Sequence, residues 1–162
     1  MKTFKLISLC VLDGKKGQVE QKMVPIEDGL IINMANPHAW YIEAIVDKDQ
    51  AKYFQMIYER RGNILVDVVI TSKDNHPAAM ITNVESVTPL SGQMSILLKG
   101  ELAFKKDDLL ADVLEDIVNE GFKGQELLEE FGNRRQNLIE YSQRTLDELY
   151  QTLRKGGRYS LE

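Results

Sequence analysis

The sequence has few of the residues that would staple a small protein together or build a metal site. Its 162 residues include one cysteine, Cys10, and two histidines, His38 and His76. A single cysteine excludes an internal disulfide framework and fits a reducing compartment, so we expect a cytoplasmic protein. A chain of this length is close to the usual size of one domain and can bury enough apolar surface to fold without such staples.

Long apolar runs are also missing. No stretch approaches the roughly 18 consecutive apolar residues that span a membrane. The amino-terminal stretch MKTFKLISLCVL carries two lysines before an apolar run, as a signal peptide would. Ser8 interrupts that run, and DGKKG follows it in place of a small-residue cleavage site, so a first β-strand is the better interpretation. We therefore expect no signal peptide and no membrane partner.

The chain lacks a surplus of positive charge. The first 100 residues carry 11 basic and 11 acidic side chains, whereas residues 101–162 carry 9 basic and 14 acidic ones. Because phosphate backbones are bound by clustered lysine and arginine, nucleic acid is not an expected partner. The acidic carboxyl-terminal part is better suited to docking on a basic partner.

Up to about residue 105, apolar residues alternate or form short runs rich in valine, isoleucine and aromatics, which is typical of β-strands. We expect about seven strands, at residues 3–12, 18–25, 30–34, 39–47, 63–72, 78–87 and 92–104. The stretch DKDQAKYFQMIYERRG has helical spacing and predicts a short helix near 49–61, ended by Gly62. Because closure removes exposed strand edges, we expect residues 1–105 to form an antiparallel β-barrel core, with a sandwich as the alternative.

The stretch PIEDGLIINMANPHAWYIEAIVD, residues 25–47, holds the one tryptophan of the chain. It predicts two strands joined by a turn at Asn36 and Pro37, with His38 in the loop. Trp40 shares a strand face with apolar residues, so we expect it to anchor a core. A lone histidine without a second histidine or cysteine nearby is weak support for a metal site.

From Asp107 the apolar period becomes helical. The segment DDLLADVLEDIVNEG predicts one helix that ends at Gly121, and a second extends from about Gln125 to Lys155. Residues 106–157 therefore predict an α-helical hairpin that packs on the barrel or projects from it. The fold class that we expect is α+β.

The second of these helices is longer than the first. At 1.5 Å per residue the two would be about 45 Å and about 21 Å long, so the far half of the second needs another surface. That half carries Leu146, Leu149, Tyr150 and Leu153. The barrel wall, a break at Gly132 or another subunit would each provide cover. We take these four residues as a candidate interaction surface.

A second, weaker candidate surface is the acidic face of the first helix, with Asp112 and Asp116. General acid catalysis needs a carboxyl group buried enough to raise its pKa, which a solvated helix face does not provide. Asp47 and Asp49 have a calcium-like spacing but lack the glycine and closing glutamate of an EF-hand loop. Cys10 lies in mid-strand, where we expect a buried small hydrophobe. We predict no catalytic, cofactor or metal residues and no enzyme activity.

Several phrases of the first 105 residues resemble the YwpF-like family of small Firmicute proteins. They are MKTFKLISLCVL, PIEDGLIINM, the W-x-I-E-A strand and LLKGELAF. The resemblance implies a β-barrel core followed by a two-helix pair, with a barrel similar to the tube-forming proteins of type VI secretion systems. It implies no catalytic residues and slightly favours self-association.

Taken together, these observations predict a non-enzymatic module that interacts with a protein partner or with another copy of itself. The alternative is a small-molecule-binding barrel with weak catalytic activity, because barrel mouths and interiors can hold ligands. Its pocket would be lined by Trp40, Tyr41 or the aromatics between Tyr53 and Tyr58.

Overall fold

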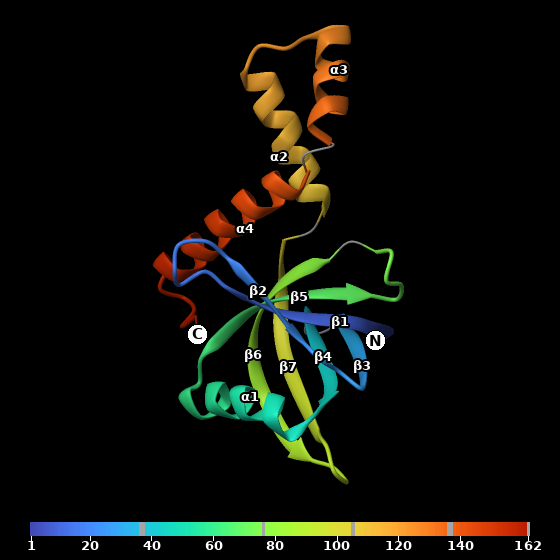
Figure 1. Cartoon of the computed structure of the whole chain (residues 1–162), viewed down its shortest axis with the longest axis vertical. Helices are drawn as coiled ribbons and strands as arrows, with labels where there is room; N and C mark the ends of the chain where they lie inside the picture. Colours follow the sequence, from blue (N-terminus) through green and yellow to red (C-terminus); the bar gives the residue numbers. More distant parts are fainter. Residues whose placement is uncertain (36–37, 76, 105, 136–137, 162) are drawn as a thin grey trace.

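The computed structural model describes residues 1–35, 38–75, 77–104, 106–135 and 138–161, without the side chains of 38, 104, 106–109, 135 and 138–142. Within these residues the chain forms a β-barrel, with the carboxyl-terminal helices toward the top of the view and the first helix low beside the barrel (Figure 1). The strands are β1 (Lys2–Asp13), β2 (Glu20–Val24), β3 (Asp28–Ala35), β4 (His38–Val46), β5 (Asn63–Ile70), β6 (Ala78–Pro89) and β7 (Met94–Phe104). The helices are α1 (Lys48–Arg60), α2 (Lys106–Asn119), α3 (Gly124–Arg135) and α4 (Leu138–Lys155).

Six of the strands close into an antiparallel barrel, which confirms the predicted fold class. Their order around the ring is β1, β3, β4, β7, β6 and β5, and the pairing of β1 with β5 closes it. The long strand β1 makes this possible. One of its edges pairs with β3 through residues 2–5 and then with β2 through residues 9–13, while its other edge pairs with β5. The strand β2 is therefore an addition outside the ring.

Alternation along the strands fills the barrel interior with aliphatic side chains. The fully buried members of this inner core include Leu9, Ile31, Ile42, Val66 and Leu98, each from a different strand. Helix α1 adds Ala51, Phe54 and Ile57 to the same core. As expected, Trp40 packs against the inner core, although it is only partly buried.

The ends of α1 show which residues cap it. Asp47 accepts a hydrogen bond from the backbone N–H of Gln50 at 2.7 Å, as an N-cap residue does. At the other end Arg61 has the left-handed conformation, with φ of 54°. The expectation that Gly62 would take that position was wrong by one residue. Gly62 instead donates its N–H to the carbonyl of Ile57, which completes the cap one position later.

The carboxyl-terminal part contains three helices where the sequence predicted two. The first, α2, matches its predicted range. The predicted second helix is divided: α3 continues through Gly132 and ends at Arg135, and α4 begins at Leu138. The predicted two-helix hairpin was therefore wrong in this respect, because α4 turns back to pack on the barrel instead of extending α3.

Helix α4 covers part of the outer wall of the barrel. A second core lies between them, formed by Leu12, Val19, Leu65, Ala79, Ile81, Leu146 and Tyr150. The carboxyl-terminal residues join this core as well. Leu161 packs against it, and the backbone N–H of Asn63 donates to the carbonyl of Ser160 at 2.6 Å. The barrel thus has an inner core and an outer core that share the same strands.

Candidate functional site

Polar side chains on one face of α4 hold it against the turn between β1 and β2. Asp147 accepts a hydrogen bond from the N–H of Val19 at 2.6 Å, and Gln143 donates to the carbonyl of Val19 at 3.0 Å. One turn further on, Gln151 donates to the carbonyl of Gly14 at 3.2 Å. These three side chains are spaced four residues apart and so lie on one helix face. They fix the register of α4 on the barrel.

The apolar residues of α4 that the sequence singled out lie beneath that helix. Leu146 and Tyr150 are 2% and 0% exposed, and Leu149 and Leu153 pack partly buried against the same outer core. The ring of Tyr150 lies so close to Gly14 that a Cβ there would be 2.6 Å from it. The chain's own barrel thus supplies their cover, so the proposal of these four residues as an interaction surface is corrected.

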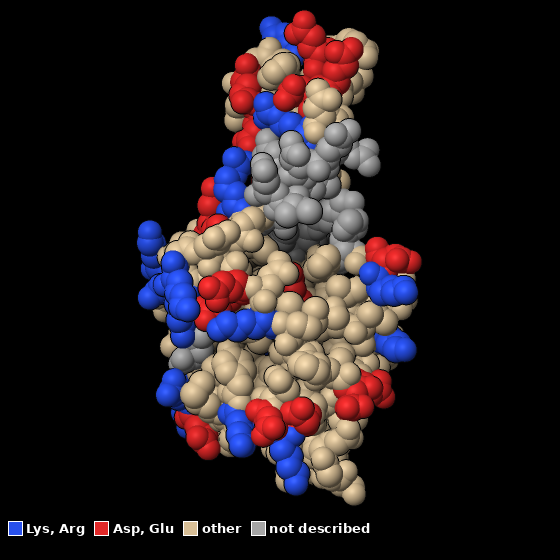
Figure 2. All heavy atoms as spheres, viewed as in Figure 1, with Lys and Arg blue, Asp and Glu red and all other residues tan. Residues whose placement is uncertain are grey.

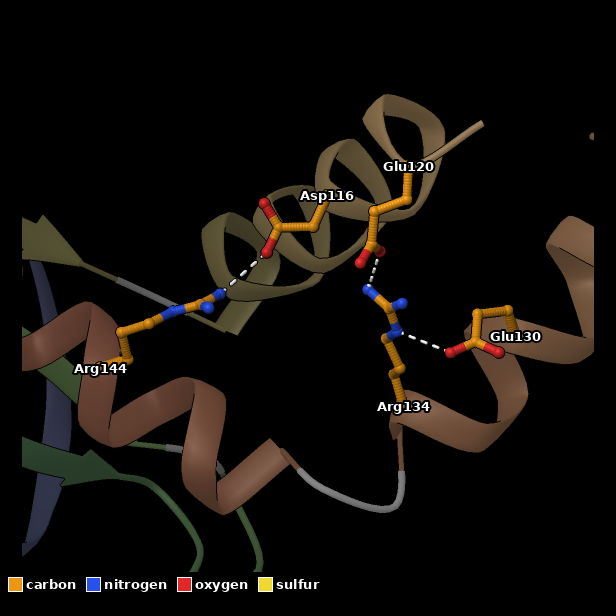
Figure 3. Close-up of polar contacts among 5 residues, drawn as sticks. All are labelled: Asp116, Glu120, Glu130, Arg134 and Arg144. Carbon is orange, nitrogen blue, oxygen red and sulfur yellow. Dashed lines mark hydrogen bonds and ion pairs between the residues drawn. The ribbon is translucent and has the colours of Figure 1, made fainter. Parts of the chain in front are cut away.

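The two aspartates of the weaker candidate surface differ in their environments. Asp112 is exposed on α2. Asp116 accepts a hydrogen bond from the guanidinium of Arg144 at 2.8 Å and forms an ion pair with it, which links α2 to α4 (Figure 3). Asp112 is thus available at the surface, whereas Asp116 has a partner inside the chain.

A second arginine holds α2 and α3 together. Arg134 forms ion pairs with Glu120 at the end of α2 and with Glu130 on its own helix (Figure 3). Its guanidinium also lies 5.9 Å from the centre of the Phe122 ring. We call α2 and α3 the helical arm, because they project from the barrel as a pair (Figure 1).

The helical arm exposes apolar side chains that the sequence analysis did not select. Leu114 and Val118 on α2 are 41% and 54% exposed, and Leu128 on α3 is 63% exposed. The neighbouring Val113 and Ile117 are fully buried. Leu114 and Val118 are one turn apart, so they extend the apolar stripe of α2 beyond the width that its neighbours cover. The width of that stripe was the signal in the sequence that could have found them.

The helical arm is also strongly acidic. Residues 110–134 carry seven acidic and two basic side chains. Figure 2 shows these acidic side chains gathered at the top of the view, over the arm. Exposed apolar side chains with a rim of one charge are typical of a surface that binds another protein.

A groove lies near the other end of the molecule, between α1 and the ends of β6 and β7. It has a volume of about 390 Å³, and Ala51, Met56, Val87 and Met94 line it. Lys48 and Lys52 lie along its edge at the start of α1, and Glu59 lies near the end of that helix. The same end of α1 also carries the N-cap residue Asp47 and the first-turn residue Asp49.

One open end of the barrel has a further hollow of about 390 Å³, lined by Phe4, Trp40, Ile70, Thr71 and Asn75. Of the aromatics that the sequence proposed for a ligand pocket, only Trp40 lines this hollow. Tyr53 packs against the inner core instead, as part of α1. Within the described residues no charged side chain lines the hollow.

Cys10 and Asp67 face each other across the pairing of β1 with β5. Burial raises the pKa of Asp67 to about 6, and burial together with the Asp67 charge raises the pKa of the Cys10 thiol. A raised pKa makes a thiolate less available, so Cys10 is a buried small side chain, as predicted. His76 and the side chain of His38 lie outside the described residues.

The described part of the chain contains no group of three or more histidine, cysteine, aspartate or glutamate side chains that could hold a metal ion. None of its helices is both long and apolar enough to cross a membrane.

Comparison with known proteins identifies the family of this chain. Residues 2–134 match the family model described as YwpF-like protein. The chain belongs to the YwpF-like family. The match confirms the resemblance seen in the first 105 residues and extends it through α2 and most of α3. Helix α4 begins after the matched range.

Two relatives show how far the YwpF-like fold is shared. The uncharacterized protein YwpF of Bacillus subtilis (strain 168) is 36% identical over 134 residues, which are 81% of this chain and 97% of that protein. A crystal structure of a hypothetical protein from Staphylococcus aureus is 25% identical with a TM-score of 0.57. That match covers 84% of this chain and 94% of the other. Neither description assigns an activity to the YwpF-like family.

Proposed function

We propose that this protein is a non-enzymatic module that associates with other copies of itself. In this proposal the helical arm of one copy binds the α1 groove of the next. The observation that supports it is the exposure of Leu114, Val118 and Leu128 on an arm that projects from the barrel. Fully burying an aliphatic side chain of this size contributes about 1.5–3 kcal/mol, so their exposure favours a partner.

The groove offers chemistry that complements the arm. Its floor contains Met56 and Met94, and methionine side chains adapt their shape to an incoming apolar surface. Lys48 and Lys52 would lie near the acidic residues of the arm, among them Asp112 and Glu115. Lys52 already pairs with Asp49 at 3.5 Å, but both side chains are more than 80% exposed, and such pairs contribute little.

The positions of arm and groove determine what kind of assembly would form. Figure 1 shows the arm at one end of the long axis, with α1 toward the other end. Two different surfaces would therefore meet, and each contact would leave the groove of one copy and the arm of the other free. Contacts of this kind generate rings or open chains, not closed two-fold dimers. The proposal thus favours assemblies that grow with protein concentration.

Complementary variants test this proposal sharply. An arm variant, Leu114→Lys with Val118→Lys, and a groove variant, Lys48→Glu with Lys52→Glu, should each be monomeric in sedimentation velocity across a concentration series. Mixed together, they should form a one-to-one dimer, because each copy keeps one intact surface. Met23→Lys is the matched control, since Met23 is 64% exposed on β2 and belongs to neither surface. The control should associate as the unmodified protein does.

Other outcomes would decide against the proposal. If the unmodified protein stays monomeric at every concentration, self-association is excluded. Association that survives both variants would show that another surface carries it. If a basic peptide binds the arm and the barrel of another copy does not compete with it, the partner of the arm is a different protein.

A small-molecule-binding barrel is the second candidate function. The hollow beside Trp40 favours it, because ligand pockets usually have volumes of about 300–1,000 Å³ and apolar walls with a few polar groups. An aromatic ligand would quench or shift the fluorescence of Trp40, the one tryptophan of the chain. A screen of small molecules that leaves this fluorescence unchanged would count against the candidate.

A further inference from the structure

Apolar side chains also face outward on a part of the barrel wall that belongs to neither core. Ile31 of β3 and Ile42 and Ala44 of β4 point into the inner core, so alternation directs their neighbours to the outside. Each of these outward apolar side chains is partly exposed, and none is a member of the inner or the outer core. We call this outward surface of β3 and β4 the β3 face; its apolar residues are Leu30, Ile32, Met34, Tyr41 and Ile45.

Opposite charges lie on the two sides of Leu30. This residue pairs with Lys5 of β1 on one side and with Glu43 of β4 on the other. Residues directly opposite each other share a sheet face, so all three side chains point outward. Lys5 and Glu43 are exposed, and neither forms an ion pair with another described residue. Each charge is therefore available to a group from outside the chain.

A hollow beside Leu30 has the lining that a lysine side chain needs. It has a volume of about 230 Å³ and is lined by Asp28, Gly29, Leu30, Glu43 and Ile45. Leu30 and Ile45 provide aliphatic walls, and a lysine side chain packs its aliphatic stem on such surfaces while its ammonium group stays near polar groups. One oxygen of Asp28 accepts the N–H of Gly29 at 2.8 Å. The carboxylate of Glu43 is thus the better placed to receive an ammonium group.

A two-fold axis that runs along β3 would bring these features together between two copies of the chain. Because such an axis passes by Leu30, it packs this leucine against the same leucine of the other copy. It also exchanges the two sides of Leu30, so Lys5 of each copy lies over Glu43 of the other. A contact in which the same patch meets itself is isologous and closes as a dimer. The β3 face is therefore complementary to itself in both apolar surface and charge.

We propose that the β3 face is a two-fold contact between copies of this chain, in which Lys5 of each copy enters the hollow beside Glu43 of the other. The inference goes beyond the contact between the arm and the α1 groove and does not rest on it. The two proposals use different surfaces.

The size of the face indicates a weak contact. Strands lie about 4.8 Å apart, so the three strands β1, β3 and β4 give it a width of only about 10 Å. The contact therefore buries less than the roughly 1,200 Å² that stable complexes need. A single contact should form only near about 1 mM protein. Assemblies that the arm builds would present several such faces at once, and multivalency would then strengthen the pairing.

The arm variant, Leu114→Lys with Val118→Lys, is the background for the test, because its arm should not bind the groove. It should be monomeric at micromolar concentrations and pair through the β3 face as the protein approaches about 1 mM. ¹H–¹⁵N spectra recorded over this range should show concentration-dependent shifts at residues 3–5, 28–34 and 41–45. Spectra that do not change with concentration, or changes confined to another part of the molecule, would overturn the inference.

Charge reversals in this background test the reciprocal pairing. Lys5→Glu and Glu43→Lys should each weaken the dimer roughly tenfold, because like charges then meet across the axis. A mixture of the two variants should dimerise again, since both pairs of the mixed dimer join opposite charges. Lys16→Glu is the matched control: it reverses the same charge in the exposed turn between β1 and β2 and should leave the affinity unchanged. A mixture that does not recover would contradict the pairing of Lys5 with Glu43.

The position of the axis can be tested by crosslinking, because a residue on a two-fold axis meets its own copy. In the same background, Leu30→Cys should be joined between copies by a short bismaleimide. Leu97→Cys is the matched control, since Leu97 lies on β7, beyond β4, and should give little crosslinked dimer. The native Cys10 is buried and should not react. Equal crosslinking of the two variants would overturn the proposed axis.

The outcomes separate this inference from the proposed function. If the arm variant pairs through the β3 face but does not bind the groove variant, the inference stands and the contact of arm and groove fails. If the two variants bind each other but the β3 face shows no concentration dependence, the inference fails alone. A lysine-containing peptide that fills the hollow while copies of the chain do not pair would identify another protein as the occupant and overturn the inference.

Discussion

Helix α4 and the helical arm both have amphipathic sequences, but their apolar faces have different environments. Both contain leucine-rich apolar stripes with charged residues on the other faces. The stripe of α4 is covered by the outer wall of the barrel, with Leu146 and Tyr150 almost completely buried. The stripe of the arm is wider than its cover, and three large apolar side chains remain exposed. An apolar helix face thus shows that a partner surface is needed, but not which molecule supplies it.

The polar contacts of the two regions explain why the barrel of the same chain covers the apolar face of α4. Helix α4 forms hydrogen bonds with backbone groups of Gly14 and Val19 through the side chains of Gln143, Asp147 and Gln151. Because hydrogen bonds are directional, these contacts select one surface of the barrel for α4. The arm is held by ion pairs through Arg134 and Arg144. These pairs join helices to each other, and Leu114, Val118 and Leu128 stay exposed on the described part of the arm.

The largest expected effect comes from removing the central side chain beneath α4. Tyr150→Ala should lower the free energy of unfolding by about 3–5 kcal/mol, because it removes a fully buried ring and leaves a cavity. Leu128→Ala on the arm should change it by less than about 0.5 kcal/mol, because that side chain is mostly exposed. Urea unfolding followed by circular dichroism measures both. Similar effects of the two substitutions would remove the distinction between the covered helix and the uncovered arm.

The barrel wall itself offers a test that depends on pH. Asp67 has its pKa raised to about 6 by burial, so the folded state binds a proton more tightly than the unfolded state does. The stability that protonation provides is complete below about pH 4 and is lost as the pH rises through 6. Asp67→Asn should therefore stabilise the protein by about 2–3 kcal/mol at pH 7.5 and by little at pH 4.

Asp112→Asn, on the exposed face of the arm, is the control for this experiment. Urea unfolding at pH 4, 5.5 and 7.5 should show a difference between Asp67→Asn and the unmodified protein that grows with pH. The control should show no such trend. A constant difference for Asp67→Asn at all three values would contradict the assignment of the effect to proton binding at this carboxyl group.

The smallest expected effect concerns the link between the two regions. The Oδ2 atom of Asp116 lies 2.8 Å from the Nη2 atom of Arg144, and both side chains are about half exposed. A double-mutant cycle with Asp116→Ala and Arg144→Ala should give a coupling energy of about 0.2–1 kcal/mol. The coupling should decrease in 1 M salt because exposed charges are screened. No measurable coupling at low salt would show that this pair does not hold α2 against α4.

The sequence was sufficient to predict the barrel because its strands carry the same signal repeatedly. In β4, for example, Ile42, Ala44 and Val46 share one strand face, and all three are buried in the inner core. The short helix α1 was predicted close to its observed range for a related reason, since Phe54 and Ile57 lie on one helix face. Its cap differed by one residue because Arg61 adopts a conformation that usually favours glycine.

The sequence was insufficient where the outcome depends on distant contacts. The stretch from α3 to α4 has a nearly continuous helical pattern, and the direction of α4 is set by its contacts with residues 14–19. The four apolar residues of α4 were selected correctly as needing cover, but the pattern could not show that the barrel supplies it.

The order of strands around the ring has a consequence for how the protein folds. The first four strands can pair with one another as they emerge, but β1 must wait for β5, and β4 must wait for β7. One edge of this early sheet has unpaired backbone groups until about residue 70, when β5 can pair with β1, and the edge at β4 stays unpaired until about residue 104. Such edges attract other chains. The late arrival of β7 therefore makes the nascent chain most prone to aggregation before translation of the barrel is complete, and long-range closure of this kind slows folding.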